Sequence, residues 1–171
     1  LFWTNVALTI SNTVGVSWLA FTMLYTNRVQ QFTRTQILLL LALPTVCTLL
    51  SYTNHWHLLY RITTRMFQSG SFLLLEHQDG AARLVVVLYT YGLILFGLGL
   101  LFQAAVRWAQ PFRGQALLLL LAALVPLLAN VITEFDLLPL PGIDFTPFTF
   151  NVTGALMGLG LFRYRMFTLV P

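Results

Sequence analysis

Residues 113–171 read RGQALLLLLAALVPLLANVITEFDLLPLPGIDFTPFTFNVTGALMGLGLFRYRMFTLVP, and this stretch decides the fold. The run 116–132 is apolar at all but one position, and a second run, 145–162, carries no charge. Each run approaches the ~20 helical residues that are needed to cross a hydrocarbon layer. The stretch therefore predicts two antiparallel membrane helices, over residues 114–135 and 146–163, joined by an acidic, proline-rich loop.

The composition of the whole chain excludes an ordinary soluble domain. Of 171 residues, 58% are hydrophobic and only 8% are charged, a balance that would leave a soluble domain without a polar surface. The nine basic residues, all arginine, face five carboxylates, and they are too scattered along the chain to form a nucleic-acid interface. The sequence predicts an integral membrane protein whose partner is the lipid bilayer, with no nucleic acid.

Three earlier apolar runs predict membrane helices over residues 1–26, 36–52 and 84–106. The first run has aromatic side chains at both ends, as interfacial belts do. The second contains Pro44, which favours a kink. The fold class is therefore an all-α membrane protein, a polytopic helical bundle with five transmembrane helices in one domain, residues 1–171.

The segment between the second and third helices, about residues 53–82, is the only sizeable region that is expected outside the membrane. Two short runs, 58–67 and 72–77, flank the sequence Gln68-Ser69-Gly70-Ser71. Strand-forming runs around a glycine-containing turn are typical of a β-hairpin. We expect a small extracytoplasmic β-hairpin there.

Polar and small residues within the predicted helices indicate faces that avoid lipid. In the first helix Asn5, Thr9 and Asn12 follow i, i+4, i+7 spacing and share one face. Lipid cannot satisfy such side chains, so this face should look into the bundle, where interhelical hydrogen bonds are favoured over ligand binding. In the third helix Gly92, Gly97 and Gly99 are expected to allow close approach of a neighbouring helix.

The arginines predict the orientation of the chain in the membrane. Six of them fall on one side of the alternating helices, at Arg28, Arg34, Arg107, Arg113, Arg163 and Arg165. The other side has three arginines and all five acids, at Arg61, Arg65, Arg83, Glu76, Asp79, Glu134, Asp136 and Asp144. By the positive-inside rule the C-terminus is cytoplasmic and the hairpin is outside. The expected location is the inner (cytoplasmic) cell membrane, with a multi-pass topology.

Motif spacings along the chain match one family. The residues that carry the pattern are Thr53, Asn54, His57, Gly80, Tyr89, Tyr91, Pro126, Asn130, Pro141, Gly142, Asp144, Thr146, Pro147, Arg163, Tyr164, Arg165, Phe167 and Pro171. The chain resembles the N-terminal seven-transmembrane sensor region of bacterial histidine kinases, over about its last five helices. Since Leu1 lies directly in apolar sequence without a basic n-region or cleavage site, we expect an excerpt and not a signal peptide.

The resemblance implies the function. It implies an input domain of a two-component sensor histidine kinase that passes an extracytoplasmic or intramembrane stimulus to cytoplasmic signalling domains after Pro171, in a chain that works as a homodimer. The family tends to have a proline, aromatics and a histidine where this chain has Ala81, Ala82 and Val86. This departure puts in doubt an aromatic-lined ligand site near the third helix.

No enzymatic motif occurs in these residues. A kinase core needs a phosphoacceptor histidine on a soluble helix and glycine-rich ATP-lid motifs, and neither is present. His55, His57 and His77 do not match a zinc-site spacing, so no metal or cofactor is expected and capping or exposed histidines are favoured. A small-molecule transporter or channel subunit is the alternative, because polar residues and glycines in membrane helices occur there too.

Four side chains are candidates for a ligand pocket beneath the hairpin: Asn5, Asn130, Glu134 and Asn151. Helical rise places the three amides at a similar depth below the outer surface, with Glu134 one turn above Asn130. A purely structural polar layer is an equal alternative.

A second hypothesis concerns signal transmission through the last helix. Gly154 and Gly158 form a small-xxx-small pair, on which another helix should pack closely. Structural packing alone is favoured over a role in transmission. Pro126, Arg163 and Arg165 are assigned to the same pathway.

Overall fold

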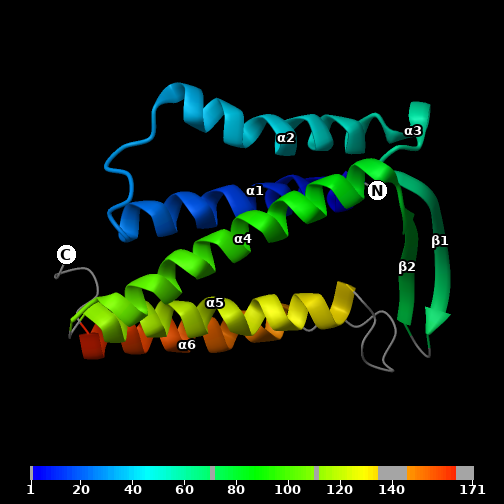
Figure 1. Ribbon diagram of the computed structural model, residues 1–171. Helices are drawn as coiled ribbons and strands as arrows, with labels where there is room; N and C mark the ends of the chain where they lie inside the picture. The colour runs from blue at the N-terminus through cyan, green and yellow to red at the C-terminus, as the bar shows by residue number, and fades with distance from the viewer. Residues whose placement is uncertain (1, 70–71, 110–111, 135–145, 165–171) are drawn as a thin grey trace. The chain divides into compact units, whose positions relative to one another are not determined.

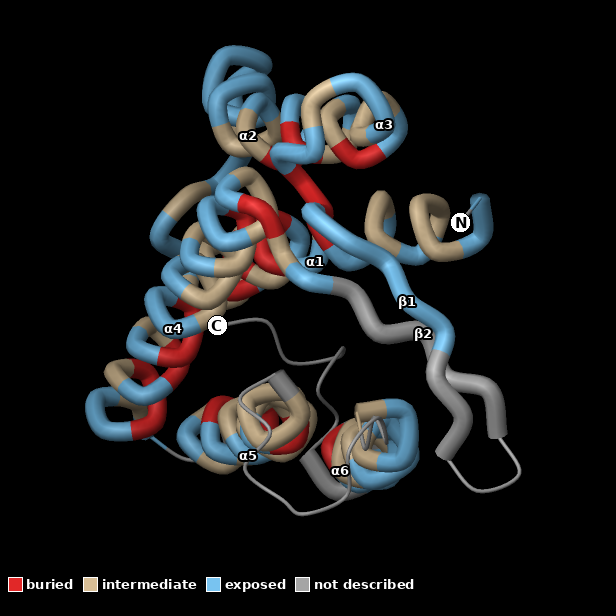
Figure 2. Tube along the Cα trace, turned by 90° about the vertical axis from the view of Figure 1, so that its right-hand side faces the viewer, coloured by how far each residue is buried: buried red, intermediate tan, exposed pale blue. Residues whose placement is uncertain are grey.

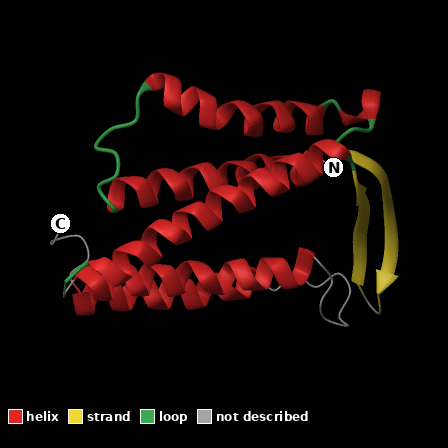
Figure 3. Ribbon diagram, viewed as in Figure 1, coloured by secondary structure: helices red, strands yellow, loops and turns green. Residues whose placement is uncertain are grey.

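The computed structural model describes residues 2–69, 72–109, 112–134 and 146–164 (Figure 1). The helices and strands within these ranges are, in chain order, α1 Phe2–Tyr25, α2 Arg34–Tyr52, α3 Asn54–His57, β1 Arg61–Ser69, β2 Phe72–Asp79, α4 Ala81–Arg107, α5 Phe112–Glu134 and α6 Thr146–Tyr164. Figure 3 shows that helix dominates and that the strands form one hairpin. The predicted fold class, a helical membrane bundle with a small hairpin, is confirmed.

Four of the described helices, α1, α2, α4 and α5, are long and apolar enough to cross a membrane. The fifth predicted span corresponds to α6, a helix of 19 residues that is not among these four. Each of the five begins and ends within three residues of its predicted range. Large apolar side chains stay exposed along them, for example Leu39, Leu88 and Phe102, and such surfaces suit contact with lipid.

The chain divides into two compact units, residues 1–97 and 98–171, with α4 contributing to both. In the first unit α1 and α2 contact each other. The hairpin lies at the end of this unit where α1 starts, α2 stops and α4 starts (Figure 1). This end of the first unit is called the hairpin end below.

Local capping explains where α2 begins. The Thr33 backbone N–H donates to Gln36 Oε1 at 3.0 Å, and the Gln36 backbone N–H donates to Thr33 Oγ1 at 3.3 Å. This reciprocal pair is a capping box, which satisfies two backbone donors that a helix start leaves free. The helix therefore starts at Arg34, two residues before the predicted start. Pro44 lies inside α2 without ending it.

Two glycines bring α1 and α4 together in the first unit. A Cβ atom added at Gly15 would lie 3.1 Å from the Thr90 backbone, and one added at Gly97 would lie 2.6 Å from Trp18 Nε1. The Trp18 indole N–H also donates across the contact to the Ile94 carbonyl oxygen at 3.2 Å. The two helices therefore approach more closely than larger residues would allow.

The predicted close approach of a neighbouring helix to α4 is observed at Gly97 but not at Gly92 or Gly99. No described atom lies within 4 Å of a Cβ added at either of those two positions. Gly92 and Gly99 are seven residues apart and share one helix face, whereas Gly97 points to a different face. The periodicity of the helix decides which glycine meets α1.

The core of the first unit joins α2, α4 and the residue that precedes β1. Cys47, Tyr60 and Val86 are buried together, and the partly buried side chains packed around them are Leu8, Leu43, Leu50 and Ala82. Tyr60 has no exposed surface. Figure 2 shows buried residues along one side of the α4 tube and exposed residues along the other. The start of the hairpin is thus part of the core.

In the second unit α5 and α6 form the predicted antiparallel pair, lying side by side in Figure 1. The Thr153 hydroxyl on α6 donates to the Ala122 carbonyl oxygen on α5 at 2.8 Å. Ala104, Ala105 and Ala116 form a small core between the end of α4 and the start of α5. Small side chains at these positions permit close helix packing.

The hairpin is antiparallel and pairs Arg61 with Asp79 at one end and Ser69 with Phe72 at the other. Its presence confirms the prediction, although β1 starts three residues later than the predicted run. The reason is local: Leu58 has a positive φ of 55°, and α3 occupies the four residues before it. The sequence pattern did not predict α3.

Candidate functional site

Asn54 organises the polar structure at the hairpin end. Its Oδ1 accepts hydrogen bonds from the backbone N–H groups of Tyr60 and Arg61, both at 2.9 Å. Its Nδ2 donates to the Arg61 carbonyl oxygen at 2.8 Å. Side-chain amides often replace a missing backbone partner where the chain turns. One amide therefore fixes the start of β1 with three hydrogen bonds.

Thr53 and His57 complete the turn that Asn54 begins. The Leu59 backbone N–H donates to His57 Nδ1 at 3.0 Å, so Nδ1 carries no proton. His57 Nε2 carries the proton and donates to Thr53 Oγ1 at 3.1 Å. The Thr53 hydroxyl then donates to the Leu49 carbonyl oxygen at 2.9 Å. His57 thus ties the turn to the end of α2.

Gly80 closes the hairpin where β2 passes into α4. Its backbone N–H donates to the Tyr60 carbonyl oxygen at 2.9 Å, and the Ala82 N–H donates to the Leu59 carbonyl oxygen at 3.0 Å. A Cβ atom added at Gly80 would overlap the Leu59 carbonyl oxygen. Glycine is therefore required for the two ends of the hairpin to meet.

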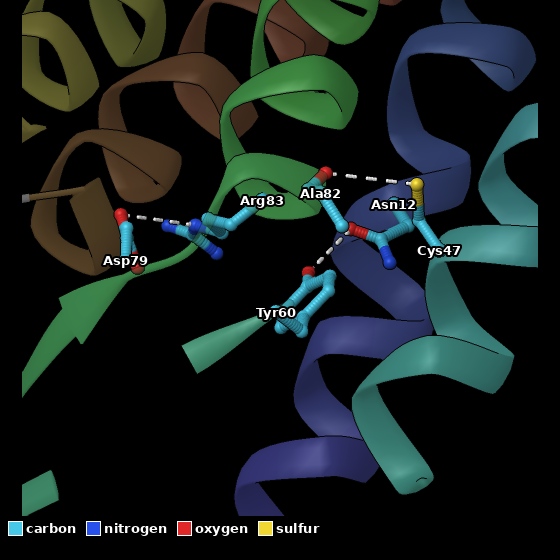
Figure 4. Close-up of polar contacts among 6 residues, drawn as sticks. All are labelled: Asn12, Cys47, Tyr60, Asp79, Ala82 and Arg83. Carbon is cyan, nitrogen blue, oxygen red and sulfur yellow. Dashed lines mark hydrogen bonds and ion pairs between the residues drawn. The ribbon is translucent and has the colours of Figure 1, made fainter. Parts of the chain in front are cut away.

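Two side chains from the start of β1 reach α1. The Tyr60 hydroxyl donates to Asn12 Oδ1 at 3.4 Å (Figure 4). The Arg61 guanidinium donates through Nη2 to Asn5 Oδ1. Since both partners lie on α1, the hairpin is bonded to a helix that is distant from it in the sequence.

The polar face of α1 also meets α2. Asn5 Nδ2 donates to the Ser51 carbonyl oxygen at 3.4 Å, and Asn12 Nδ2 donates to Thr48 Oγ1 at 3.2 Å. Thr9 bonds within its own helix, to the Asn5 carbonyl oxygen. The prediction that this face looks into the bundle and makes interhelical hydrogen bonds is confirmed.

Two further bonds tie α4 to α2. The Tyr89 hydroxyl donates to the Leu40 carbonyl oxygen at 2.8 Å. The Cys47 thiol donates to the Ala82 carbonyl oxygen at 3.7 Å (Figure 4). Tyr91, the second tyrosine of the sequence motif, is half-buried. Thr53, Asn54, His57 and Tyr89 from the motif therefore have visible roles in holding helices and turn together.

Arg61 is the least expected residue of the site. Only 4% of its surface is exposed, and its guanidinium lies 6.0 Å from the Tyr60 ring centroid. Burial lowers the pKa of Arg61, and the charge of Arg83 lowers it further, while Tyr60 and Asp79 act in the opposite direction. Asp79 itself pairs with Arg83 at 3.5 Å (Figure 4). The sequence showed Arg61 only as one of three outer arginines.

A family model described as the N-terminal 7TM region of histidine kinase matches residues 1–171. The chain belongs to this family. No curated protein and no solved structure matches the chain. Membership confirms the resemblance that the motifs indicated. Four of the described helices are long and apolar enough to span a membrane, as a 7TM region requires.

The four residues of the 7TM region that were predicted to line a ligand pocket are divided between its two units. Asn5 is in the first unit and bonds to Arg61 and Ser51. Asn130 and Asn151 are in the second unit: Asn130 is half-buried, and Asn151 is exposed and donates to the Phe148 carbonyl oxygen of its own helix at 3.4 Å. Glu134 ends α5, and its side chain lies outside the described residues. A common pocket for the four stays a prediction.

The predicted transmission residues of the 7TM region lie in its second unit. Pro126 is half-buried within α5. At Gly154 and Gly158 of α6, no described atom lies within 4 Å of an added Cβ. Pro147 is in the first turn of α6, where proline is tolerated. The motif residues that lie wholly or by their side chains outside the described structure are Pro141, Gly142, Asp144, Arg163, Tyr164, Arg165, Phe167 and Pro171.

Proposed function

We propose that this 7TM region is the sensory input domain of a two-component sensor histidine kinase. It receives an extracytoplasmic or intramembrane stimulus at the hairpin end and passes it to cytoplasmic output modules that follow Pro171 in the same chain. The observation that carries the proposal is the family match over residues 1–171. The hairpin end supports the proposal, because its hydrogen bonds connect the hairpin to the membrane helices and so give a stimulus a route to them.

The proposed orientation follows from the arginines. The connector between α1 and α2 carries Arg28, and α2 starts at Arg34, at the end of the first unit opposite the hairpin. An excess of basic residues in short connectors favours the cytoplasm. We place the protein in the cytoplasmic membrane with the hairpin outside and the C-terminus inside.

Contacts in the first unit provide a mechanism for passing a stimulus from the hairpin to the membrane helices. The hairpin is bonded to α1 through the Arg61–Asn5 and Tyr60–Asn12 contacts. It continues directly into α4 through Gly80. A ligand that displaces the hairpin therefore acts on two helices at once. We propose that their tight contact at Gly97 converts that displacement into a relative shift along the membrane normal, because a Cβ atom added there would already lie 2.6 Å from Trp18 Nε1.

In the second unit α6 is the element that leads toward the output modules. Its bond from Thr153 to Ala122 couples it to α5. Its glycine face at Gly154 and Gly158 is open to contact by a helix of a second chain, in keeping with the homodimer that the kinase class implies. We propose this face and Pro126 as part of the transmission pathway, and Asn130, Glu134 and Asn151 as its polar outer level.

The test uses the full-length kinase in membrane vesicles and compares autophosphorylation of Gly97→Ala with that of Gly99→Ala. The first change places a methyl group against Trp18, and the second meets no described atom within 4 Å. We expect a several-fold change in basal autophosphorylation for Gly97→Ala alone, at equal amounts in the membrane. Wild-type output from both variants would refute the proposed coupling. Solute flux through proteoliposomes, with no effect on kinase output, would support the transporter or channel alternative instead.

A further inference from the structure

The turn between α2 and β1 keeps its polar side chains inside and presents apolar side chains outward. Thr53, Asn54 and His57 all hydrogen-bond within the turn, to the start of β1 or to the end of α2. Clusters of exposed apolar side chains mark sites that contact another protein or a membrane. The exposed large hydrophobic side chains of this turn, called the turn surface below, are Tyr52, Trp56, Leu58 and Leu59.

Leu58 adopts a backbone conformation that leucine rarely takes. Its φ of 55° is in the left-handed region, where Gly and Asn are favoured and the Cβ atom of other residues meets steric resistance. Leu58 gains little from packing inside the protein, because 52% of the residue is exposed. A residue held in a sparsely populated conformation points to a functional constraint. The constraint at this position is an apolar side chain that faces away from the protein.

The turn surface lies at the end of a membrane helix. α2 is long and apolar enough to cross a membrane and ends at Tyr52, two residues before α3 begins at Asn54. In Figures 1 and 2, α3 lies beside the end of α2, whereas the two strands extend from the opposite side of the first unit. Leu49, one turn before Tyr52, is exposed as well. The turn surface therefore continues the lipid-facing side of α2, at the level where tryptophan and tyrosine are enriched in membrane proteins.

We propose that the turn surface rests in the outer leaflet of the bilayer, with its aromatic rings among the lipid headgroups and its leucines against the upper acyl chains. The inference deepens the proposed sensory function, and it rests on the proposed orientation for the choice of the outer leaflet. Residues 52–59 include no arginine, lysine or carboxylate, so the surface has no strong charge that would select a charged protein or peptide. The headgroup region is polar, so small polar reagents still reach this level from outside.

The lipid contact is bonded to the hairpin through α3. Trp56 lies on α3 between Asn54, which holds the start of β1, and His57, which is bonded to Thr53. A movement of Trp56 in the leaflet therefore acts on the residues that fix the base of the hairpin. The turn surface thus connects the outer leaflet to the hairpin end.

The direct test places the same polar fluorophore at two positions of the full-length protein in nanodiscs of phosphatidylethanolamine and phosphatidylglycerol. Trp56→Cys and Met66→Cys, in a background without native cysteines, are a matched pair because Trp56 is 77% and Met66 76% exposed. Met66 lies on β1, outside the turn surface. We expect lipids that carry a nitroxide near the headgroup to quench the fluorophore at position 56 several-fold more than the one at position 66. Iodide in the water should give the reverse order.

A second measurement avoids the label. Trp56→Ser and Met66→Ser each remove an exposed apolar side chain, and thermal unfolding of both variants is followed in the same nanodiscs. We expect Trp56→Ser to lower Tm by several degrees, because the tryptophan loses its burial in the interface. Met66→Ser should change Tm little, because an exposed side chain in water contributes little to stability.

Three results would overturn the proposal. Stronger quenching by iodide at position 56 than at position 66 would show that the turn surface faces water. Protection of position 56 from both quenchers would show that a protein surface covers the turn. A wild-type Tm for Trp56→Ser would show that lipid does not bury this side chain. Because kinase activity is not measured, any of these results together with altered output in Gly97→Ala would remove this inference and leave the sensory function standing.

Discussion

Replacing Asn54 with alanine should destabilise the hairpin end strongly. The change removes the acceptor for two backbone N–H groups and the donor for one carbonyl oxygen. The two N–H groups belong to Tyr60 and Arg61, whose exposed fractions are 0% and 4%. An unsatisfied buried donor costs about 1–3 kcal/mol. Because some water can reach the turn, we expect a total loss near the low end, about 3 kcal/mol.

The assay compares Asn54→Ala, Asn54→Asp and Asn151→Ala in detergent by thermal unfolding. A loss of ~3 kcal/mol lowers Tm by roughly 6–12 °C in a chain of this size. Aspartate keeps the acceptor but loses the donor to the Arg61 carbonyl oxygen, so its Tm should fall between wild type and Asn54→Ala. Asn151 is exposed and bonds only within its own helix among described contacts, at 3.4 Å; its replacement should change Tm little.

The ranking of the three Tm values tests whether the Asn54 hydrogen bonds stabilise the hairpin end. If Asn54→Ala unfolds at the wild-type temperature, the three hydrogen bonds do not hold the hairpin end and the account of the site is wrong. If Asn54→Asp is as unstable as Asn54→Ala, the two backbone donors are not the main source of the loss.

Three further predictions concern other parts of the chain. Gly80→Ala should lower Tm through about 1–3 kcal/mol of overpacking against the Leu59 carbonyl oxygen, and a wild-type Tm would contradict the close contact. Thr153→Val should cost only ~0.6 kcal/mol, because a single interhelical bond in a membrane contributes about that much; a loss of several kcal/mol would show a larger role. In a variant lacking the native cysteine, Trp56→Cys, at a side chain that is 77% exposed, should react with an impermeant thiol reagent added to intact cells. Arg34→Cys should be protected there, and the reverse pattern would overturn the orientation.

The sequence was sufficient for the membrane helices and the hairpin because both depend on long, repeated patterns. Uncharged runs of sufficient length have few alternatives to a membrane helix. The antiparallel pairing of α5 with α6 then followed from their order and the short loop between them. Boundaries moved by up to three residues where local bonds decide, as at the Thr33 capping box before α2.

The contacts of the hairpin end were harder to predict because they depend on single side chains. The bonds of Asn54 to Tyr60 and Arg61 join residues six and seven positions apart, a spacing with no helical or strand period. The T-N-x-x-H motif was the available signal, and it marked the right residues without giving their roles. The burial of Arg61 had no signal in the sequence, since Arg61 and Arg65 occur in similar surroundings along the chain.

The length of α4 indicates the level relative to the membrane at which Arg61 lies. Arg83 and Arg107 mark the two charged ends of this helix. At ~1.5 Å per residue they are roughly 36 Å apart, slightly more than the ~30 Å of hydrocarbon. In the orientation that we propose, with the hairpin outside, Arg83 lies among the lipid headgroups of the outer leaflet, and so does Asp79, its ion-pair partner. Because β1 pairs Arg61 with Asp79, Arg61 shares this level. Anionic lipids at that level would act on the charges of Arg61, Asp79 and Arg83, so the stability of the hairpin end should differ between membranes of different surface charge.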